Sequence, residues 1–227
     1  MDINIHYIEK GQGEPLILLH GNGEDNTYFK NQIDLFAKYY HVYAIDSRGH
    51  GKTSRGKKEL SIKQFSQDLK DFFDMHQIKK AHILGFSDGG NVALVFAHDY
   101  PQMVLKLILN GANLFPNGLK KNVFFPIKMG YIFSKLFCWT SQKVRLKNEL
   151  LGLMVKDIGL SINDLVSFSI KTLVIVGNND MIKESHTRLI ANSIKDSKMV
   201  IINGNHFIAS NNPKEFNEVV LDFLLTD

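Results

Sequence analysis

The stretch Gly85-Phe86-Ser87-Asp88-Gly89-Gly90 decides the fold prediction. An apolar run at 81–86, typical of a buried strand, leads into it, and a helical pattern at 88–99 follows it. A serine at a sharp strand-to-helix turn must adopt a strained backbone, and glycines two residues to either side remove side chains that would collide there. An ordinary glycine-rich turn can also carry this pattern, so the motif alone is weak. Its position between a strand and a helix favours Ser87 as a nucleophile.

Apolar runs and helical patterns alternate along most of the chain. This alternation predicts an α/β fold, in which a mostly parallel central sheet has helices on both faces. The expected strands are 3–8, 15–19, 41–45, 81–86, 104–109, 172–176 and 198–202, and the expected helices are 27–39, 61–76, 88–99 and 213–224.

Residues 111–170 break the alternation, because they contain no convincing strand. Pro116 and Pro126 are expected to interrupt the first half of this segment. Leu146, Leu150 and Leu153 then recur at helical spacing. We therefore predict a core formed by 1–110 and 171–227, with a helical lid inserted at 111–170.

Composition and charge narrow the class of protein. A chain of 227 residues, 44% of them hydrophobic, can bury one core without metals or disulfides. The net charge of +4 comes from scattered basic residues, so we expect no nucleic-acid partner. Cys138 is the single cysteine, and the first residues lack a secretory pattern, so we expect a cytoplasmic protein, either a monomer or a dimer.

A serine nucleophile needs a base and a group that orients that base. Two later segments supply candidates, each just after an expected strand: Asp180 after 172–176, and His206 after 198–202. The carboxyl ends of parallel strands are where open α/β sheets place their sites. A lone Asp or His in a loop is usually only solvated, but three candidates in the order Ser, Asp, His are much less frequent by chance.

The segment His20-Gly21-Asn22-Gly23 follows the apolar run 15–19. Acyl transfer creates an oxyanion, and backbone N–H groups aimed at it supply much of the rate enhancement. Glycines let such a backbone come close to the substrate. We assign the backbone amides of Asn22 and Asp88 as the two donors.

These motifs, together with Asp46-Ser47-Arg48-Gly49-His50-Gly51, resemble the α/β-hydrolase family over nearly the whole chain and most weakly at 111–170. The resemblance implies Ser87 as nucleophile, Asp180 as acid and His206 as base, with no cofactor. It is specific for the fold and the triad but not for the substrate. The chain is somewhat short for the family, which implies a reduced lid or a missing helix.

Other patterns in the sequence do not indicate a phosphate-binding loop, a further catalytic histidine or a metal site. Residues 46–53 end like a phosphate-binding loop, but Asp46 stands where that loop requires glycine. His20 is expected to hold the loop before Asn22, and His50 to belong to a structural turn. No H-E-x-x-H or C-x-x-C spacing is present in the sequence, so we expect no metal site.

Asp88 has two interpretations. An acidic residue in the first turn of a helix interacts favourably with the helix dipole. Alternatively, it binds a cationic group of the substrate, such as the amine of an amino-acid ester, because biphenyl-hydrolase-like esterases have a similar Ser-Asp-Gly-Gly elbow. We favour the first interpretation and keep Asp88 among the candidate substrate-binding residues.

The expected lid is aromatic and basic, with an excess of five positive charges over 115–170. We expect Phe124, Phe125 and Trp139 to cover an apolar substrate pocket while the lysines face solvent. Contact of the lid with a membrane surface is the less favoured interpretation.

The sequence therefore predicts a serine hydrolase that cleaves a small carboxylic ester or a related acyl bond through an acyl-enzyme. Carbon–carbon bond hydrolysis, thioester hydrolysis and perhydrolysis remain open on the same triad, because a fold does not choose among them. A small-molecule receptor of the same fold also remains open, although a binder needs no matched serine and base.

Overall fold

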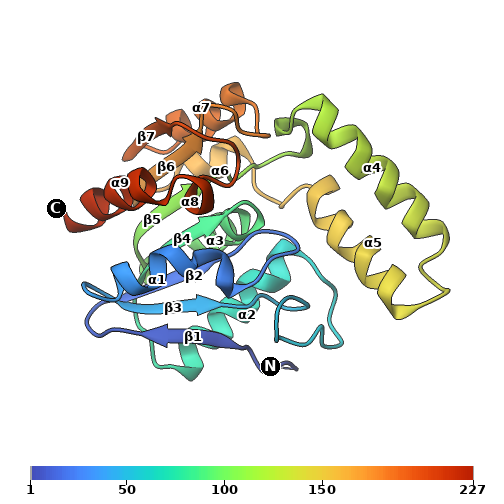
Figure 1. Cartoon of the computed structure of the whole chain (residues 1–227), viewed down its shortest axis with the longest axis horizontal. Coiled ribbons are helices and arrows are strands. Elements are labelled where there is room, and N and C mark those ends of the chain that lie inside the picture. The colour runs from blue at the N-terminus through green and yellow to red at the C-terminus, as the bar shows by residue number, and fades with distance from the viewer. Residues whose placement is uncertain (1, 227) are drawn as a thin grey trace.

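The computed structural model describes residues 2–226 and contains a seven-stranded sheet in the order β1-β3-β2-β4-β5-β6-β7 (Figure 1). β1 runs antiparallel to β3, and every other neighbouring pair is parallel, so the predicted fold class is confirmed. The strands are β1 (Tyr7–Lys10), β2 (Pro15–Leu19), β3 (His41–Ile45), β4 (Ala81–Phe86), β5 (Val104–Asn110), β6 (Lys171–Gly177) and β7 (Ser197–Ile202).

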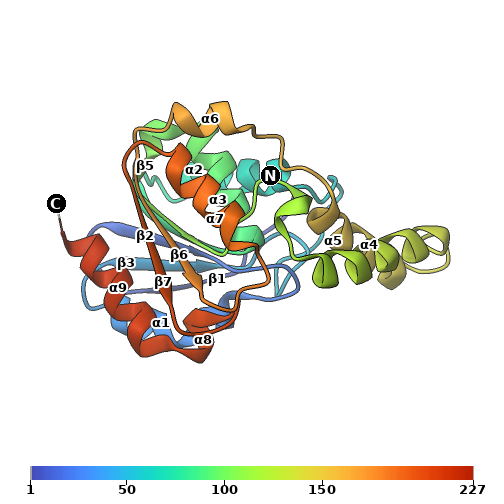
Figure 2. The same ribbon diagram turned by 90° about the horizontal axis from the view of Figure 1, so that it is seen from above.

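Helices cover both faces of the sheet (Figure 2). α2, α3, α6 and α7 pack on one face, and α1, α8 and α9 pack on the other, each over its own apolar cluster. The helices are α1 (Lys30–Phe36), α2 (Ile62–Met75), α3 (Asp88–Asp99), α4 (Lys121–Leu136), α5 (Gln142–Val155), α6 (Ile162–Val166), α7 (Glu184–Ser193), α8 (Ile208–Asn211) and α9 (Pro213–Leu225).

The first strand differs from the prediction. The alternation over 3–8 predicted a strand there, but β1 begins at Tyr7. Ile3 and Ile5 are nevertheless buried in the core. An extended loop that lies against a core alternates buried and exposed side chains as a strand does. The alternation therefore reported burial correctly, but its assignment to a strand from residue 3 was wrong.

Two helices were not anticipated from the sequence. In α7 the buried side chains include His186 and Thr187, so polar residues occupy part of its inner face and weaken the apolar periodicity. α8 has only four residues, which is too short to show a period. Both helices follow loops that carry candidate site residues.

Three helices lie between β5 and β6. α4 and α5 form an antiparallel hairpin that projects from the core (Figures 1 and 2), whereas α6 packs on the core through the fully buried Leu165. The expected interruption at Pro126 is wrong, because α4 continues through that residue on an exposed surface. Within 2–226, no helix is both long enough and apolar enough to cross a bilayer.

Parallel pairing brings the candidate residues to one edge of the sheet. The loops after β2, β4, β6 and β7 all leave the carboxyl ends of adjacent parallel strands. These loops carry Asn22, Ser87, Asp180 and His206, respectively. Residues more than a hundred positions apart in the sequence are thereby gathered at the edge from which the α4–α5 hairpin projects (Figure 1).

A buried ion pair ties the loop after β3 to α2. The Arg48 side chain is fully buried, and its Nε and Nη2 donate to the two carboxylate oxygens of Asp68, at 2.7 Å each. Arg48 also pairs with Asp2, at 2.7 Å. These hydrogen bonds raise the pKa of Arg48 above its ordinary value, which favours the charged form in spite of burial. Residues 46–53 are therefore a structural turn.

We expect Arg48→Ala to lower the free energy of unfolding by about 3–5 kcal/mol, because it strands the Asp68 carboxylate in the core. Urea unfolding followed by circular dichroism measures this change. Arg188→Ala is the control: it removes an exposed helical pair with Glu184, and it should cost less than about 1 kcal/mol. Equal losses in the two variants would contradict the assignment.

Candidate functional site

Ser87 lies on a strained turn between β4 and α3. Its backbone has φ 52° and ψ −119°, a region that side chains disfavour. A Cβ atom on Gly85 would lie 2.3 Å from the Gly89 carbonyl oxygen, and a Cβ atom on Gly89 would lie 2.2 Å from the Leu19 carbonyl oxygen. The backbones approach so closely that only glycine fits at both positions. The serine is held there by a hydrogen bond from its N–H to the Asn110 carbonyl, at 2.8 Å.

Ser87, His206 and Asp180 form one hydrogen-bonded chain. His206 Nδ1 lies 2.8 Å from Asp180 Oδ1, and His206 Nε2 lies 3.0 Å from Ser87 Oγ. The same Asp180 oxygen accepts the backbone N–H of Ile182, at 2.8 Å. An ionised carboxylate can only accept, so Nδ1 donates to Asp180 and leaves Nε2 to accept the Ser87 proton. His206 and Asp180 are both buried.

The surroundings of His206 hold the imidazole in this orientation. A Cβ atom on Gly111 would lie 2.7 Å from His206 Cε1, so a larger residue would displace the ring. The rings of Phe86 and Phe207 lie 4.8 and 5.6 Å from the imidazole centroid. Packing and hydrogen bonds together hold the imidazole in the orientation that faces Ser87.

The loop after β2 is joined to the turn at Ser87 through two side chains. Asn22 Nδ2 donates to Asp88 Oδ2, at 2.8 Å, and to the Leu150 carbonyl oxygen of α5, also at 2.8 Å. Asn91 Nδ2 donates to the other Asp88 oxygen, at 3.2 Å. The structure thus joins Asn22 and Asp88 through their side chains, and the expected oxyanion role of their backbone amides stays a prediction.

The Asp88 carboxylate is buried, and burial raises its pKa. Because each of its oxygens already accepts an amide hydrogen bond, it is placed to position Asn22 and Asn91 rather than to face a ligand. The geometry favours a structural role for this side chain over recognition of a cationic substrate group.

His20 holds the loop after β2 through two hydrogen bonds. Its Nδ1 lies 2.7 Å from the Gly21 carbonyl oxygen, and its Nε2 accepts the backbone N–H of Ser47, at 3.0 Å. Burial, and after it the nearby His50, lower its pKa to about 4. A neutral His20 therefore pins the loop after β2 to the loop after β3, as its predicted role requires.

Glu24 is a site residue that the sequence analysis missed. Its Oε2 accepts the backbone N–H of Gly21, at 3.3 Å, and burial raises its pKa to about 7. Its position one residue beyond the glycine loop was the available signal, but only the fold shows that it is partly buried.

Two of the three aromatic residues expected over the substrate face solvent. Phe125 is 66% exposed, and Trp139, in the turn between α4 and α5, is 82% exposed. Phe124 is half-buried on α4, with the Lys128 ammonium 5.8 Å from its ring centroid. The exposure of Phe125 and Trp139 does not fit side chains that cover an apolar pocket.

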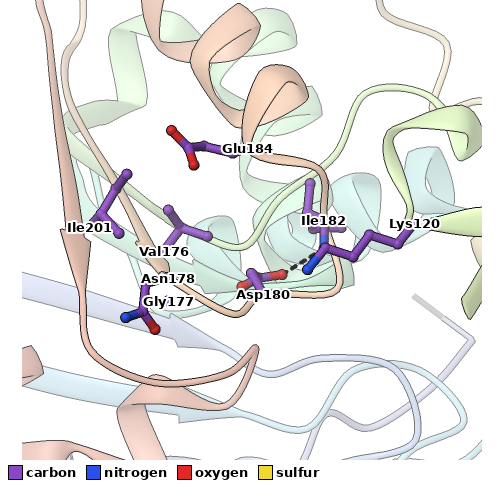
Figure 3. Close-up of a pocket in the computed structure, with 8 residues that line it drawn as sticks. All are labelled: Lys120, Val176, Gly177, Asn178, Asp180, Ile182, Glu184 and Ile201. Carbon is purple, nitrogen blue, oxygen red and sulfur yellow. Dashed lines mark hydrogen bonds between the residues drawn. The ribbon is translucent and has the colours of Figure 1, made fainter.

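A cavity of about 170 Å³ borders Asp180 at the carboxyl ends of β6 and β7 (Figure 3). Lys120, which precedes α4, and Glu184, in the first turn of α7, line it together with apolar side chains. Among residues 2–226, no group of three or more His, Cys, Asp or Glu side chains is arranged to hold a metal ion.

Residues 14–154 match the model of a protein family described as the alpha/beta hydrolase fold. The chain belongs to this family. The α/β-hydrolase assignment also agrees with the sheet order, the strained Ser87 turn and the side chains gathered around it.

Curated relatives include the serine hydrolase BPHL of Mus musculus, 26% identical over 98% of this chain and 83% of the mouse protein. The 2-hydroxy-6-oxo-6-phenylhexa-2,4-dienoate hydrolase of Comamonas testosteroni is 34% identical over 56% of this chain and 45% of its own length. An uncharacterised protein of Mycobacterium tuberculosis is 32% identical over 50% of this chain, but the match spans only 32% of that protein. The shared length differs widely among these relatives.

Solved α/β-hydrolase structures have the same fold. A meta-cleavage product hydrolase from Pseudomonas fluorescens IP01 superposes with a TM-score of 0.80 at 22% identity, covering 98% of this chain and 94% of that one.

We expect Gly89→Ala to lower the free energy of unfolding by about 3 kcal/mol or more, because the added methyl group would overlap the Leu19 backbone. Thermal and urea unfolding measure the loss. Gly130→Ala in α4 is the matched control: its Cβ would lie 3.4 Å from Leu151 Cδ1, in ordinary contact. That change should be neutral or stabilising by up to about 1 kcal/mol; a neutral Gly89→Ala would refute the steric argument.

A second prediction concerns Glu24. Its pKa is about 7 in the folded protein, against an ordinary value of 4.5. Between these values the folded state binds more protons than the unfolded state, so stability falls as pH rises from about 5 to about 8. Glu24→Gln should flatten part of this fall and should stabilise the protein by about 1–2 kcal/mol at the upper end, where Glu24 is otherwise charged. Parallel pH dependences of the unfolding temperature in the two proteins would contradict the prediction.

Proposed function

We propose that this α/β-hydrolase is a serine hydrolase that cleaves a small carboxylic ester through an acyl-enzyme on Ser87. The observation that carries the proposal is the unbroken chain of hydrogen bonds from Asp180 through His206 to Ser87 Oγ. A serine hydroxyl becomes a nucleophile only when an oriented base can take its proton, and this chain supplies both the base and its orientation.

The proposed reaction has two halves. His206 Nε2 takes the Ser87 proton while Oγ attacks the ester carbonyl, and the backbone amides of Asn22 and Asp88 stabilise the oxyanion. His206 then gives that proton to the departing alkoxide, which leaves the acyl group on Ser87. In the second half His206 takes a proton from water, the hydroxide attacks the acyl carbon, and the carboxylic acid leaves as Ser87 regains its proton.

The carboxyls beside the site support a neutral substrate rather than an anionic one. Glu24 holds the loop that carries Asn22, and Asp88 directly follows the proposed nucleophile. Burial raises the pKa of both carboxyls, because negative charge is poorly solvated there. An anionic substrate would meet the same cost.

Carbon–carbon bond hydrolysis is the second candidate. The Comamonas relative is named for a ketone-bearing dienoate, and 34% identity over 56% of this chain supports a related reaction. That substrate is an anion, however, and the charge argument above places it behind a neutral ester.

We propose a cytoplasmic enzyme with a small-molecule substrate, because its single cysteine, Cys138, cannot form an internal disulfide.

The test is hydrolysis of p-nitrophenyl esters from acetate to decanoate by wild type and by Ser87→Ala. Removal of the nucleophile should reduce kcat by a factor on the order of 10⁶, and the chain-length optimum will report the size of the pocket. Ser47→Ala, a serine in the loop after β3, is the matched control and should retain activity.

Equal inactivity of wild type and Ser87→Ala on every ester would reject the ester proposal. A ketone-bearing dienoate would then be assayed with the same variants. Turnover that requires Ser87 would support the second candidate, and binding without turnover would indicate a receptor.

A further inference from the structure

The outer side of α4 presents apolar side chains to solvent. Phe125, Ile132 and Leu136 recur at spacings of seven and four, which places them on one face of the helix. Phe133 lies beside this face, and Phe137 and Trp139 continue it into the turn after α4. These six residues, the outer apolar face, have exposed fractions of 66% (Phe125), 44% (Ile132), 57% (Phe133), 61% (Leu136), 55% (Phe137) and 82% (Trp139).

A row of lysines borders the outer apolar face. Lys121, Lys128 and Lys135 follow one another at intervals of seven residues, so they form a single stripe along α4, and all three are exposed. Long lysine side chains can lay their methylene groups along an apolar surface while their ammonium groups reach toward polar phosphates. The stripe and the apolar face thus form the pattern of a helix that lies in a membrane interface.

The charge of the hairpin indicates what kind of partner binds the outer apolar face. Within 120–156 the single acidic residue is Glu149, and it already pairs with Arg55 of the core and with Arg145. Eight lysine and arginine residues belong to the same segment. A second copy of this chain would bring a second positive stripe against the first, whereas an anionic lipid surface complements both the charge and the apolar side chains.

The hairpin is attached to the core so that the outer apolar face stays available. The attachments are on α5: Leu150 accepts the Asn22 side chain, Glu149 pairs with Arg55, and Leu153 is buried in the core. None of the residues of α4 itself is buried. To cover Ser87 with the outer apolar face, the hairpin would have to break these contacts.

We propose that the α4–α5 hairpin docks the protein on anionic membrane surfaces, with the outer apolar face in the interface and the lysine stripe on lipid phosphates. The argument for this surface binding does not depend on the proposed ester hydrolysis. The hairpin projects from the edge of the sheet that carries Ser87 (Figures 1 and 2), so docking holds that edge near the bilayer.

Trp139 makes the proposal directly measurable, because it is the only tryptophan of the chain and lies at the tip of the hairpin. Addition of vesicles of phosphatidylglycerol and phosphatidylcholine should shift its emission to the blue and protect it from iodide. The protein should also sediment with these vesicles. Vesicles of phosphatidylcholine alone, or high salt, should greatly weaken both effects, because added salt shortens the range of charge attraction.

Charge reversal distinguishes binding by the lysine stripe from a general effect of the protein's net charge. The triple variant Lys121→Glu, Lys128→Glu, Lys135→Glu should weaken vesicle partitioning by about 100-fold or more, since each lysine contributes about fivefold. The control is Lys30→Glu, Lys38→Glu, Lys214→Glu, which makes the same change in net charge at exposed positions on α1, after α1 and on α9. It should retain most of the binding. Phe133→Ser with Leu136→Ser should reduce partitioning while leaving the lysines in place.

Three outcomes would overturn the proposal. One is unchanged Trp139 emission and no sedimentation with anionic vesicles. Another is equal loss of binding in the two triple variants, which would show that net charge alone is responsible. The third is a blue shift that depends on protein concentration without vesicles and accompanies a dimer in size-exclusion chromatography, which would assign the outer apolar face to a second copy of the chain.

Discussion

The close approach of backbone to backbone around Ser87 is the constraint on which the site depends. Gly85 and Gly89 allow α3 to start directly against β4 and the end of β2. That contact forces the serine into its strained conformation and puts Asp88, the next residue, beside the loop that follows β2. Nucleophile, helix start and glycine loop are therefore positioned by one steric condition rather than by three separate ones.

Three buried carboxylates near this turn hold different groups in place. Asp180 holds His206, Asp88 holds the Asn22 and Asn91 side chains, and Asp46 accepts the backbone N–H groups of Asn26 and Lys52. Each accepts at least two hydrogen bonds, which lowers the cost of removing it from water, although both bonds to Asp180 go to the same oxygen, Oδ1. Glu24 differs, because a single weak backbone hydrogen bond does not offset its burial, and its pKa rises to about 7.

The predictable part of the structure is the part governed by local patterns. Apolar runs located β2, β3 and β4 at their observed bounds, and the order Ser87, Asp180, His206 followed from their positions after strands. Burial in loops could not be predicted from local patterns. The alternation that begins at Ile3 resembled a strand, and the sequence around Glu24 does not indicate its partial burial. The aromatic residues of the hairpin were misleading for a related reason, since composition identifies Phe125 and Trp139 as apolar but does not say which side of a helix meets the core.

Asn22 links the turn at Ser87, the loop after β2 and the α4–α5 hairpin. Its side chain joins the Asp88 carboxylate to the Leu150 carbonyl of α5, and its own backbone amide belongs to the loop proposed to face the oxyanion. A shift of α5 by more than a fraction of an ångström would break the bond to Leu150 or pull on the loop. One amide side chain therefore joins the hairpin to the loop beside Ser87. An interaction that repositions the hairpin, such as the proposed membrane contact, would act on the geometry around Ser87 through this residue.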